Sequence, residues 1–180
     1  EGEGEGEFGA LVRSAGAHVG FVQDMDADRL AVVDERGVAI GTDATVVLVI
    51  RRWLERAPGP VVASVSTSRM VDDVAAAFGC PVYRSPVGEA HVIEAMKLHG
   101  ADVGGEGDGG AIVLRVNPCR DSFAAMALVL EAMATSGRTV AELRAQVPRY
   151  AMARERLLCL GRDIVPSLRV IRDLFRGERL

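Results

Sequence analysis

Short apolar runs alternate with longer amphipathic stretches along most of the chain, and this order constrains the fold more than any other feature. An apolar run such as Val61–Val65 is typical of a buried strand. In the next stretch, Val71, Val74 and Phe78 recur at the spacing of one helix face. Strands that alternate with helices of about ten or more residues indicate a layered α/β domain. We therefore expect an αβα domain with a mostly parallel or mixed sheet.

Composition excludes several classes of partner. The 180 residues are 49% hydrophobic, which is enough for one sizeable core. A formal charge of −4 argues against a general nucleic-acid-binding surface, because such surfaces are basic. The apolar run Val46–Ile50 is too short to span a membrane. Cys80, Cys119 and Cys159 form no CxxC pair and are typical of reduced thiols in a cytoplasmic protein.

Three carboxylates, Asp24, Asp26 and Asp28, alternate with other residues between two apolar, strand-like runs. In a loop they can converge on one point, where a cation is needed to offset their repulsion. Ligands that are all oxygen suit Mg²⁺, Ca²⁺ or Mn²⁺ rather than Zn²⁺ or Cu²⁺. A solvated turn between two strands is the alternative. The apolar flanks and the arginine that follows, Arg29, favour a metal site.

Two other loop types share parts of this pattern. An EF-hand counted from Asp24 would have Glu35 as its last ligand, but Arg29 stands where its sharp turn needs glycine, and the flanks are strand-like. A haloacid-dehalogenase-type phosphatase also follows a strand with D-x-D and would use Asp24 as its nucleophile. Asp28 stands where that family has Thr or Val. The EF-hand is excluded, and the phosphatase remains an alternative.

A second loop, residues 104–110, combines glycines with Glu106 and Asp108. It lacks the G-x-G-x-x-G spacing and following helix of a dinucleotide-binding loop, and its carboxylates would repel phosphate. They are better suited to accept hydrogen bonds from sugar hydroxyls, with a plain acidic turn as the alternative. Loops that follow strands collect at one edge of an α/β sheet. We therefore expect this loop to converge with Asp24–Arg29 and Ser66–Arg69.

Four separated segments resemble the α-D-phosphohexomutase family, which includes phosphoglucomutase, phosphomannomutase and phosphoglucosamine mutase. DMDADR at 24–29 resembles the magnesium loop D-x-D-x-D-R of that family. GGEGDGG at 104–110 resembles its sugar-specificity loop and is most similar to the archaeal-type phosphoglucosamine mutase or phosphomannomutase branch, with Asp108 where Asn is usual. VSTSRMVDDVAAAFG and VYRSPVGEAHVIEAM resemble the rest of the third domain, and Arg120-Asp121 before an apolar helix also fits.

The resemblance implies a magnesium-dependent isomerase that interconverts hexose 1-phosphate and hexose 6-phosphate through a phosphoserine and a bisphosphorylated sugar. The Mg²⁺ ligands that it implies are Asp24, Asp26 and Asp28. Arg29 would be a catalytic residue that binds the phosphoserine. The substrate-binding residues that it implies are Glu106, Asp108 and, in a bordering loop, Glu89.

The resemblance also divides the chain into parts. We expect a disordered or artificial end at 1–7, the end of the preceding second domain at 8–18, the third α/β domain at 19–148, and a connection toward a C-terminal domain at 149–180. Because the phosphoserine motif of the T-A-S-H-N-P type is absent, we expect the chain to be inactive alone. Its partners would be the phosphosugar, the other domains of the enzyme and, as a further candidate, a second copy of the enzyme. A non-catalytic sugar- or metal-binding domain remains the alternative.

Overall fold

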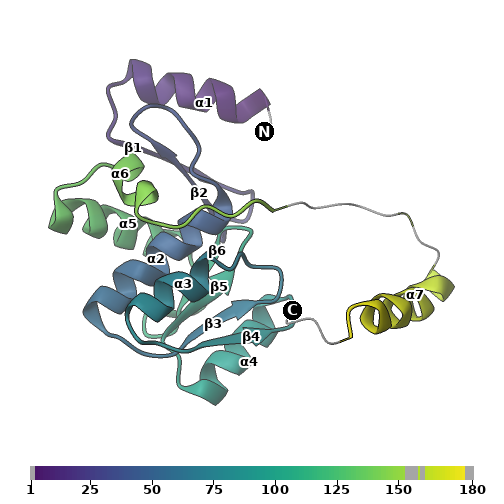
Figure 1. The fold of residues 1–180 in the computed structure, drawn as a ribbon. Helices are drawn as coiled ribbons and strands as arrows, with labels where there is room; N and C mark the ends of the chain where they lie inside the picture. The colour runs from purple at the N-terminus through teal and green to yellow at the C-terminus, as the bar shows by residue number, and fades with distance from the viewer. Residues whose placement is uncertain (1–2, 153–157, 159–160, 177–180) are drawn as a thin grey trace. The chain divides into compact units, whose positions relative to one another are not determined.

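The computed structural model describes residues 3–152, 158 and 161–176. The chain divides into two compact units, Glu1–Tyr150 and Ala151–Leu180 (Figure 1). The first unit holds a five-stranded sheet and a separate two-stranded hairpin. The described part of the second unit is essentially one helix, α7 (Gly161–Leu174). Within the described residues, no helix combines the length and the apolar character that crossing a membrane requires.

The central sheet has the strand order β4-β3-β5-β6-β7. Its strands are β3 (Val61–Ser64), β4 (Val82–Ser85), β5 (Val103–Glu106), β6 (Gly110–Val113) and β7 (Asn117–Arg120). Strand β3 pairs in parallel with β4 and β5, whereas β6 pairs antiparallel with β5 and β7. The expectation of an α/β domain with a mixed sheet is therefore confirmed.

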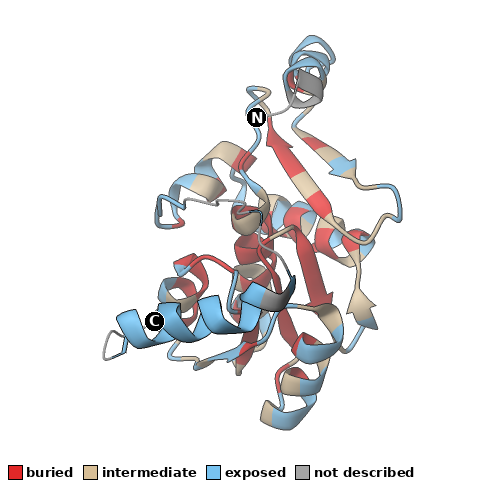
Figure 2. Cartoon of the chain, turned by 90° about the vertical axis from the view of Figure 1, so that its right-hand side faces the viewer, coloured by how far each residue is buried: buried red, intermediate tan, exposed pale blue. Residues whose placement is uncertain are grey.

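Helices cover both faces of this sheet (Figure 1). The helices of the first unit that pack on or beside it are α2 (Thr42–Arg56), α3 (Met70–Ala77), α4 (Glu89–His99), α5 (Ser122–Ser136) and α6 (Val140–Ala145). Alternate residues of β3 separate the two faces. Val61 and Ala63 join the larger apolar cluster with α2, α3 and α5, whereas Val62 packs with Val92 and Met96 of α4. Figure 2 shows the buried strands between helices whose outer sides are exposed.

The hairpin of β1 (Val19–Gln23) and β2 (Leu30–Asp34) carries the acidic loop. The strands pair antiparallel in a register that sets Gln23 opposite Leu30, so residues 24–29 form the hairpin loop. Strand β2 contacts α2 and α5, which places this loop beside the central sheet. After the turn at 34–37, the apolar residues Val38–Ile40 predict a short strand, but the structure forms only a single bridge there, between Val33 and Ala39.

Helices lie toward both ends of the described chain. Helix α1 spans Glu3–Ser14 and so includes residues 3–7. Glutamates near the positive end of the helix dipole, followed by the apolar residues of the next turn, favour this extension. The sequence predicts a last helix over Pro166–Phe175 with the proline near its first turn, but α7 begins at Gly161, so Pro166 lies inside the helix. The sequence also predicts an extended segment at 149–160, most of which lies outside the described residues.

Candidate functional site

The loop between β1 and β2 brings Asp24, Asp26 and Asp28 together. One carboxylate oxygen from each of these residues lies within 4.8 Å of the other two. At such distances the three negative charges repel one another, and a bound cation would relieve that repulsion. The loop thus has the spacing that the sequence analysis expected of it.

Helix α5 holds the turn of this loop. Ala27 adopts a φ of 58°, in the left-handed region that residues other than glycine seldom occupy. Its carbonyl accepts a hydrogen bond of 2.6 Å from the hydroxyl of Ser122, the first residue of α5. That hydroxyl in turn accepts a hydrogen bond of 2.6 Å from the side-chain amide of Gln23. These contacts fix the loop conformation from a part of the chain distant in sequence.

Asp24 organises the loop from within. Its Oδ1 accepts the backbone N–H groups of Asp28 and Arg29, each at 3.2 Å, and its Oδ2 lies 2.5 Å from Nε of Arg29. Burial alone would raise the pKa of Asp24, but the backbone N–H and the guanidinium of Arg29 outweigh burial and lower the pKa to about 2. Asp24 is therefore ionised at neutral pH, and both of its oxygens are engaged.

Asp28 is in a different environment. Its Oδ2 forms an ion pair of 2.6 Å with Nη2 of Arg120, whereas its Oδ1 is buried and accepts no hydrogen bond from any described residue. Burial raises the pKa of Asp28; the charges of Asp26 and Asp24 add to this rise, and Arg120 opposes it. Among the described residues, the nearest cationic atom to Oδ1 is Nε of Arg29 at 3.6 Å, which is too far for a hydrogen bond, so this buried oxygen still lacks a donor. Beside two other carboxylates, that oxygen suits a hard divalent cation.

The glycine loop is the turn of the β5–β6 hairpin. Glu106 ends β5 and is only 4% exposed, and its Oε1 accepts the N–H of Gly88 at 2.8 Å. The side chain of Asp108, at the tip, is 39% exposed, and its Oδ1 accepts the N–H of Gly110 at 3.1 Å. The two carboxylates expected to bind sugar therefore differ in access to solvent.

At Gly109, the glycine loop contacts the first residue of β2. The carbonyl of Gly109 accepts the N–H of Leu30 at 3.1 Å, and the φ of Gly109 is 101°. A Cβ at this position would lie 2.5 Å from the carbonyl oxygen of Leu30, so the close approach requires glycine. Leu30 directly follows the acidic loop, which brings the two loops side by side.

Arg120, at the end of β7, was not singled out as a site residue by sequence. Its guanidinium lies 2.6 Å from Asp28, 3.4 Å from Asp108 and 3.7 Å from Glu106. Its backbone N–H donates to Oε1 of Glu89 at 2.5 Å. These partners lie in three loops far apart in sequence, and the only signal in the sequence was that Arg120-Asp121 fits the family pattern before α5.

The structure thus brings the expected site residues together in one cluster. The Ser66–Arg69 loop is not in direct contact with it. Arg29 spans the acidic and glycine loops, with Nη1 at 3.7 Å from Oδ2 of Asp108. The Ser66–Arg69 loop joins only indirectly, because Ser68 donates its N–H to Asp43 at 2.8 Å and Asp43 borders Gly107. The acidic loop itself belongs to a separate hairpin and does not end a strand of the central sheet.

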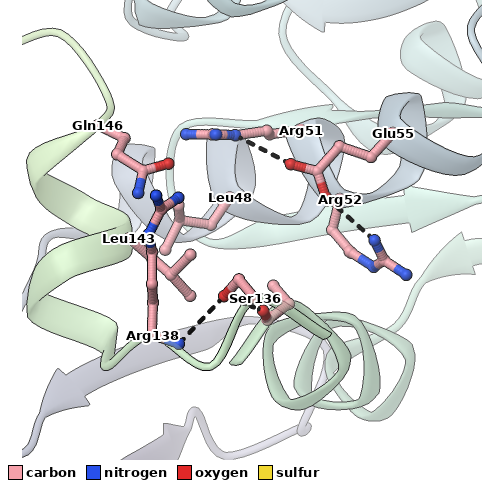
Figure 3. A pocket seen from close by; sticks show the side chains of 9 residues that line it. Leu48, Arg51, Arg52, Glu55, Ser136, Arg138, Leu143 and Gln146 are labelled. Atoms are coloured by element: carbon pink, nitrogen blue, oxygen red, sulfur yellow. Dashed lines mark hydrogen bonds and ion pairs between the residues drawn. The ribbon is translucent and has the colours of Figure 1, made fainter. Parts of the chain in front are cut away.

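A hollow of about 30 Å³ between α2, α5 and α6 lies apart from this cluster (Figure 3). None of the expected site residues lines it. Two of its arginines form ion pairs, Arg51 with Glu55 at 3.3 Å and Arg52 with Glu131 of α5 at 3.1 Å. A volume of this size holds about one water molecule. Of these pairs, Arg51–Glu55 lies within α2 and Arg52–Glu131 joins α2 to α5, so the candidate site is the loop cluster.

Comparison with known proteins agrees with the resemblance. Residues 41–150 match the family described as phosphoglucomutase/phosphomannomutase, alpha/beta/alpha domain III. A relative from Methanopyrus kandleri, named "Probable phosphoglucosamine mutase", is 37% identical over 149 residues, which are 82% of this chain and 33% of that protein. A phosphoglucomutase/phosphomannomutase from Thermococcus kodakarensis is 36% identical over 144 residues, which are 79% of this chain and 32% of that protein.

Solved structures show the same fold. A phosphoglucomutase/phosphomannomutase family protein from Burkholderia thailandensis is similar with a TM-score of 0.74 and 26% identity, over 83% of this chain and 33% of that one. This chain spans about one third of the length of the relatives it matches. The predicted resemblance, including its archaeal branch, is confirmed. The chain belongs to the phosphoglucomutase/phosphomannomutase family and carries its α/β/α domain III.

Proposed function

We propose that this chain supplies the metal-binding and sugar-binding loops of a phosphohexomutase. The parent enzyme would be an isomerase that interconverts hexose 1-phosphate and hexose 6-phosphate through a phosphoserine and a bisphosphorylated sugar. The observation that carries the proposal is the approach of Asp24, Asp26 and Asp28 to within 4.8 Å of one another, beside a glycine loop with two carboxylates. Relatives named as phosphoglucosamine mutase and phosphomannomutase support the substrate class.

The proposed metal is Mg²⁺, with Asp24, Asp26 and Asp28 as its ligands. The oxygen-only donor set and the buried Oδ1 of Asp28, which accepts no hydrogen bond from the described residues, support this choice. Bound Mg²⁺ would supply charge neutralisation for phosphoryl transfer. Within the chain, Asp24 holds Arg29 through Nε at 2.5 Å, and Nη1 of Arg29 lies 3.7 Å from Asp108.

Arg29 is proposed to bind the phosphoserine supplied by another part of the parent enzyme. Its side chain is 43% exposed, and its contact with Asp24 is made through Nε. The terminal N–H groups can then donate to a phosphate, a contact strengthened by opposite charge. The other domains of the enzyme and the phosphosugar are the partners in this proposal.

The three proposed sugar-binding residues have unequal access. Asp108 is exposed enough to accept a hydrogen bond from a sugar hydroxyl directly. Glu106 uses Oε1 for Gly88 and keeps Oε2, whose distance to Arg120 is 3.7 Å. Glu89 uses Oε1 for the backbone of Arg120 and has its second oxygen left for substrate. We therefore expect Asp108 to make the first contact with the sugar.

Two alternatives to this proposal were open from the sequence. The phosphatase loses its support, because the chain belongs to another family. A non-catalytic sugar- or metal-binding domain would use the same loops. It is distinguished by the parent protein, which would then bind sugar phosphates without converting them. A cytoplasmic location, supported by the free Cys80 and Cys119, belongs to the main proposal.

The decisive experiment replaces one proposed ligand in the parent enzyme. Asp26→Asn removes one ligand charge, so turnover of hexose 1-phosphates in Mg²⁺ buffer should fall about 100-fold or more, equivalent to about 3 kcal/mol. Asp102→Asn is the matched control, because Asp102 pairs with exposed Arg115 at 2.8 Å on the far side of the hairpin, away from the cluster. Full turnover by Asp26→Asn, with unfolding unchanged, would refute the ligand role.

The 180-residue chain alone should show no turnover of hexose 1-phosphates.

A further inference from the structure

The guanidinium of Arg120 lies between the two loops of the proposed site. Its Nη2 pairs with Asp28 of the acidic loop at 2.6 Å, and its Nη1 lies 3.4 Å from Asp108 and 3.7 Å from Glu106 of the glycine loop. The side chain is 21% exposed, so these charges interact with limited screening by water. One cation is therefore shared among three carboxylates, and the shortest pair is on the acidic loop.

The backbone of Arg120 is fixed, so the freedom at this position belongs to the side chain. Its N–H is held by Glu89 at 2.5 Å, and the next N–H, of Asp121, donates to Ala111 at 3.0 Å. Asp121 also caps α5 by accepting the N–H of Ala124 at 2.9 Å. The Nε of Arg120 is buried without a hydrogen-bond partner among the described residues. The present arrangement therefore leaves one donor of the guanidinium unused.

A cation at the acidic loop would change which carboxylate attracts Arg120. Asp28 is both the tightest partner of Arg120 and one of three residues whose oxygens converge. A divalent cation bound to Asp28 offsets its negative charge and repels the guanidinium. Asp108 and Glu106 are then the carboxylates nearest to Arg120. A small rotation of the side chain would bring Arg120 closer to them and offset their charge.

We propose that Arg120 couples the two loops, so that metal binding at the aspartates moves it from Asp28 toward Asp108 and Glu106. This inference rests on the proposed function, because it takes the ligands to be a divalent cation and a sugar phosphate. Arg120 is a positioning residue, and its shift lowers the repulsion between the acidic glycine loop and an anionic sugar. Because such coupling is reciprocal, sugar phosphate also tightens metal binding by the same factor.

The test follows backbone amides of the 180-residue chain by NMR during titration with MgCl₂ alone. The amide of Asp28 reports on the acidic loop, because it donates to Asp24. The amides of Gly88 and Gly110 report on the glycine loop, because they donate to Glu106 and Asp108. In the wild-type chain we expect all three amides to shift with one common midpoint.

Arg120→Met is the informative variant, because it keeps an unbranched stem where the side chain of Arg120 packs on Gly110. We expect the Asp28 amide still to shift and the Gly88 and Gly110 shifts to fall at least threefold. The Mg²⁺ midpoint should fall about fivefold, because Asp28 loses Arg120, the arginine nearest to it. A purely structural role predicts the opposite, weaker Mg²⁺ binding from a loosened loop. Arg115→Met, on the exposed turn of the same hairpin, should match the wild type.

The possible failures are distinguishable. Undiminished Gly88 and Gly110 shifts in Arg120→Met would overturn the coupling and leave the metal site in place. A wild-type chain in which only the amides of the acidic loop respond to Mg²⁺ would also overturn the coupling and leave the metal site in place. A wild-type chain in which no amide of residues 24–29 responds would overturn both the metal site and the coupling. If Arg120→Met does not fold, Arg120→Lys, which keeps the charge, should retain the Gly88 and Gly110 shifts, and their loss there contradicts the proposal.

Discussion

At the scale of single residues, the candidate site depends on positions where the backbone is crowded. Gly109 is held at a φ of 101° with its carbonyl hydrogen-bonded to Leu30. The hydrogen bond joins the glycine loop to the residue that ends the acidic loop. Glycine is needed here because a side chain would meet the backbone of Leu30 and not a flexible group.

Gly109→Ala should therefore destabilise the chain by about 3 kcal/mol, from the strained backbone and the contact of 2.5 Å with Leu30 together. The measurement is unfolding in urea at neutral pH. Gly137→Ala is the control, because its φ is 67° and a Cβ there would meet nothing within 4 Å. That change should cost about 1 kcal/mol, from the backbone alone. Equal losses in the two variants would show that the close approach at Gly109 does not matter.

The contacts of single residues were also the least accessible from the sequence. The pattern D-x-D-x-D predicted three converging carboxylates, because the loop is local and its residues are close in the chain. The role of Arg120 was not predicted, because its ion pairs to Asp28 and Glu106 depend on how distant loops are placed. Side-chain contacts of this kind require the tertiary fold.

At the scale of elements, α2 and α5 are joined by charged side chains, one of which, Arg52, also lines the hollow of Figure 3. Glu131 of α5 forms ion pairs with Arg52 and Arg56 of α2, each at 3.1 Å. The hydrogen bond from Arg52 is the main cause that lowers the pKa of Glu131 below its ordinary value of 4.5, while burial opposes it. These pairs supplement the apolar contacts between the two helices.

Glu131→Gln should reduce stability by about 1 kcal/mol at pH 7, because the side chain is about one third exposed and water weakens the pairs. Since folding lowers the pKa of Glu131, its contribution is complete above the unfolded value of 4.5 and is lost as pH falls through the folded value. The difference between wild type and variant should shrink below pH 4.5 in thermal unfolding across pH. Glu94→Gln on the exposed side of α4 is the control and should show no difference. A difference that grows toward low pH would contradict this assignment.

Elements with a clear hydrophobic period were predicted well, and those without one were not. The helix through Val71 and Val74 and the strand β3 follow from their spacing and apolar content. Strand β7 was missed, because its sequence Asn-Pro-Cys-Arg has no alternation and it is defined by pairing with β6. The expected strand at Val38–Ile40 finds a partner for one residue only, at the bridge with Val33.

At the scale of the whole molecule, the first unit has a core of its own. The buried apolar residues of both clusters run from Leu30 to Val147, and none comes from the described residues of the second unit. A unit with its own core is expected to fold by itself. The α/β class was predictable because it depends on the order of strands and helices and not on side-chain contacts.

A chain that ends after Tyr150 should therefore unfold cooperatively, with a midpoint within about 3 °C of the full chain. Mg²⁺ titration followed by the amide of Asp28 should give the same midpoint in both chains, since the acidic loop lies wholly in the first unit. Differential scanning calorimetry and NMR make the two measurements. Loss of the cooperative transition on truncation would show that residues after 150 contribute to this core.

The buried setting of Glu106 has a consequence for the thermodynamics of the proposed sugar binding. A glutamate on a mobile surface loop loses conformational entropy when a ligand orders it, which opposes binding by about 1 kcal/mol. Glu106 is already held by the N–H of Gly88 at 2.8 Å and is 4% exposed, so most of that loss occurs on folding. The glycine loop is thus preorganised at Glu106, and the remaining ordering on binding falls mainly on the exposed Asp108.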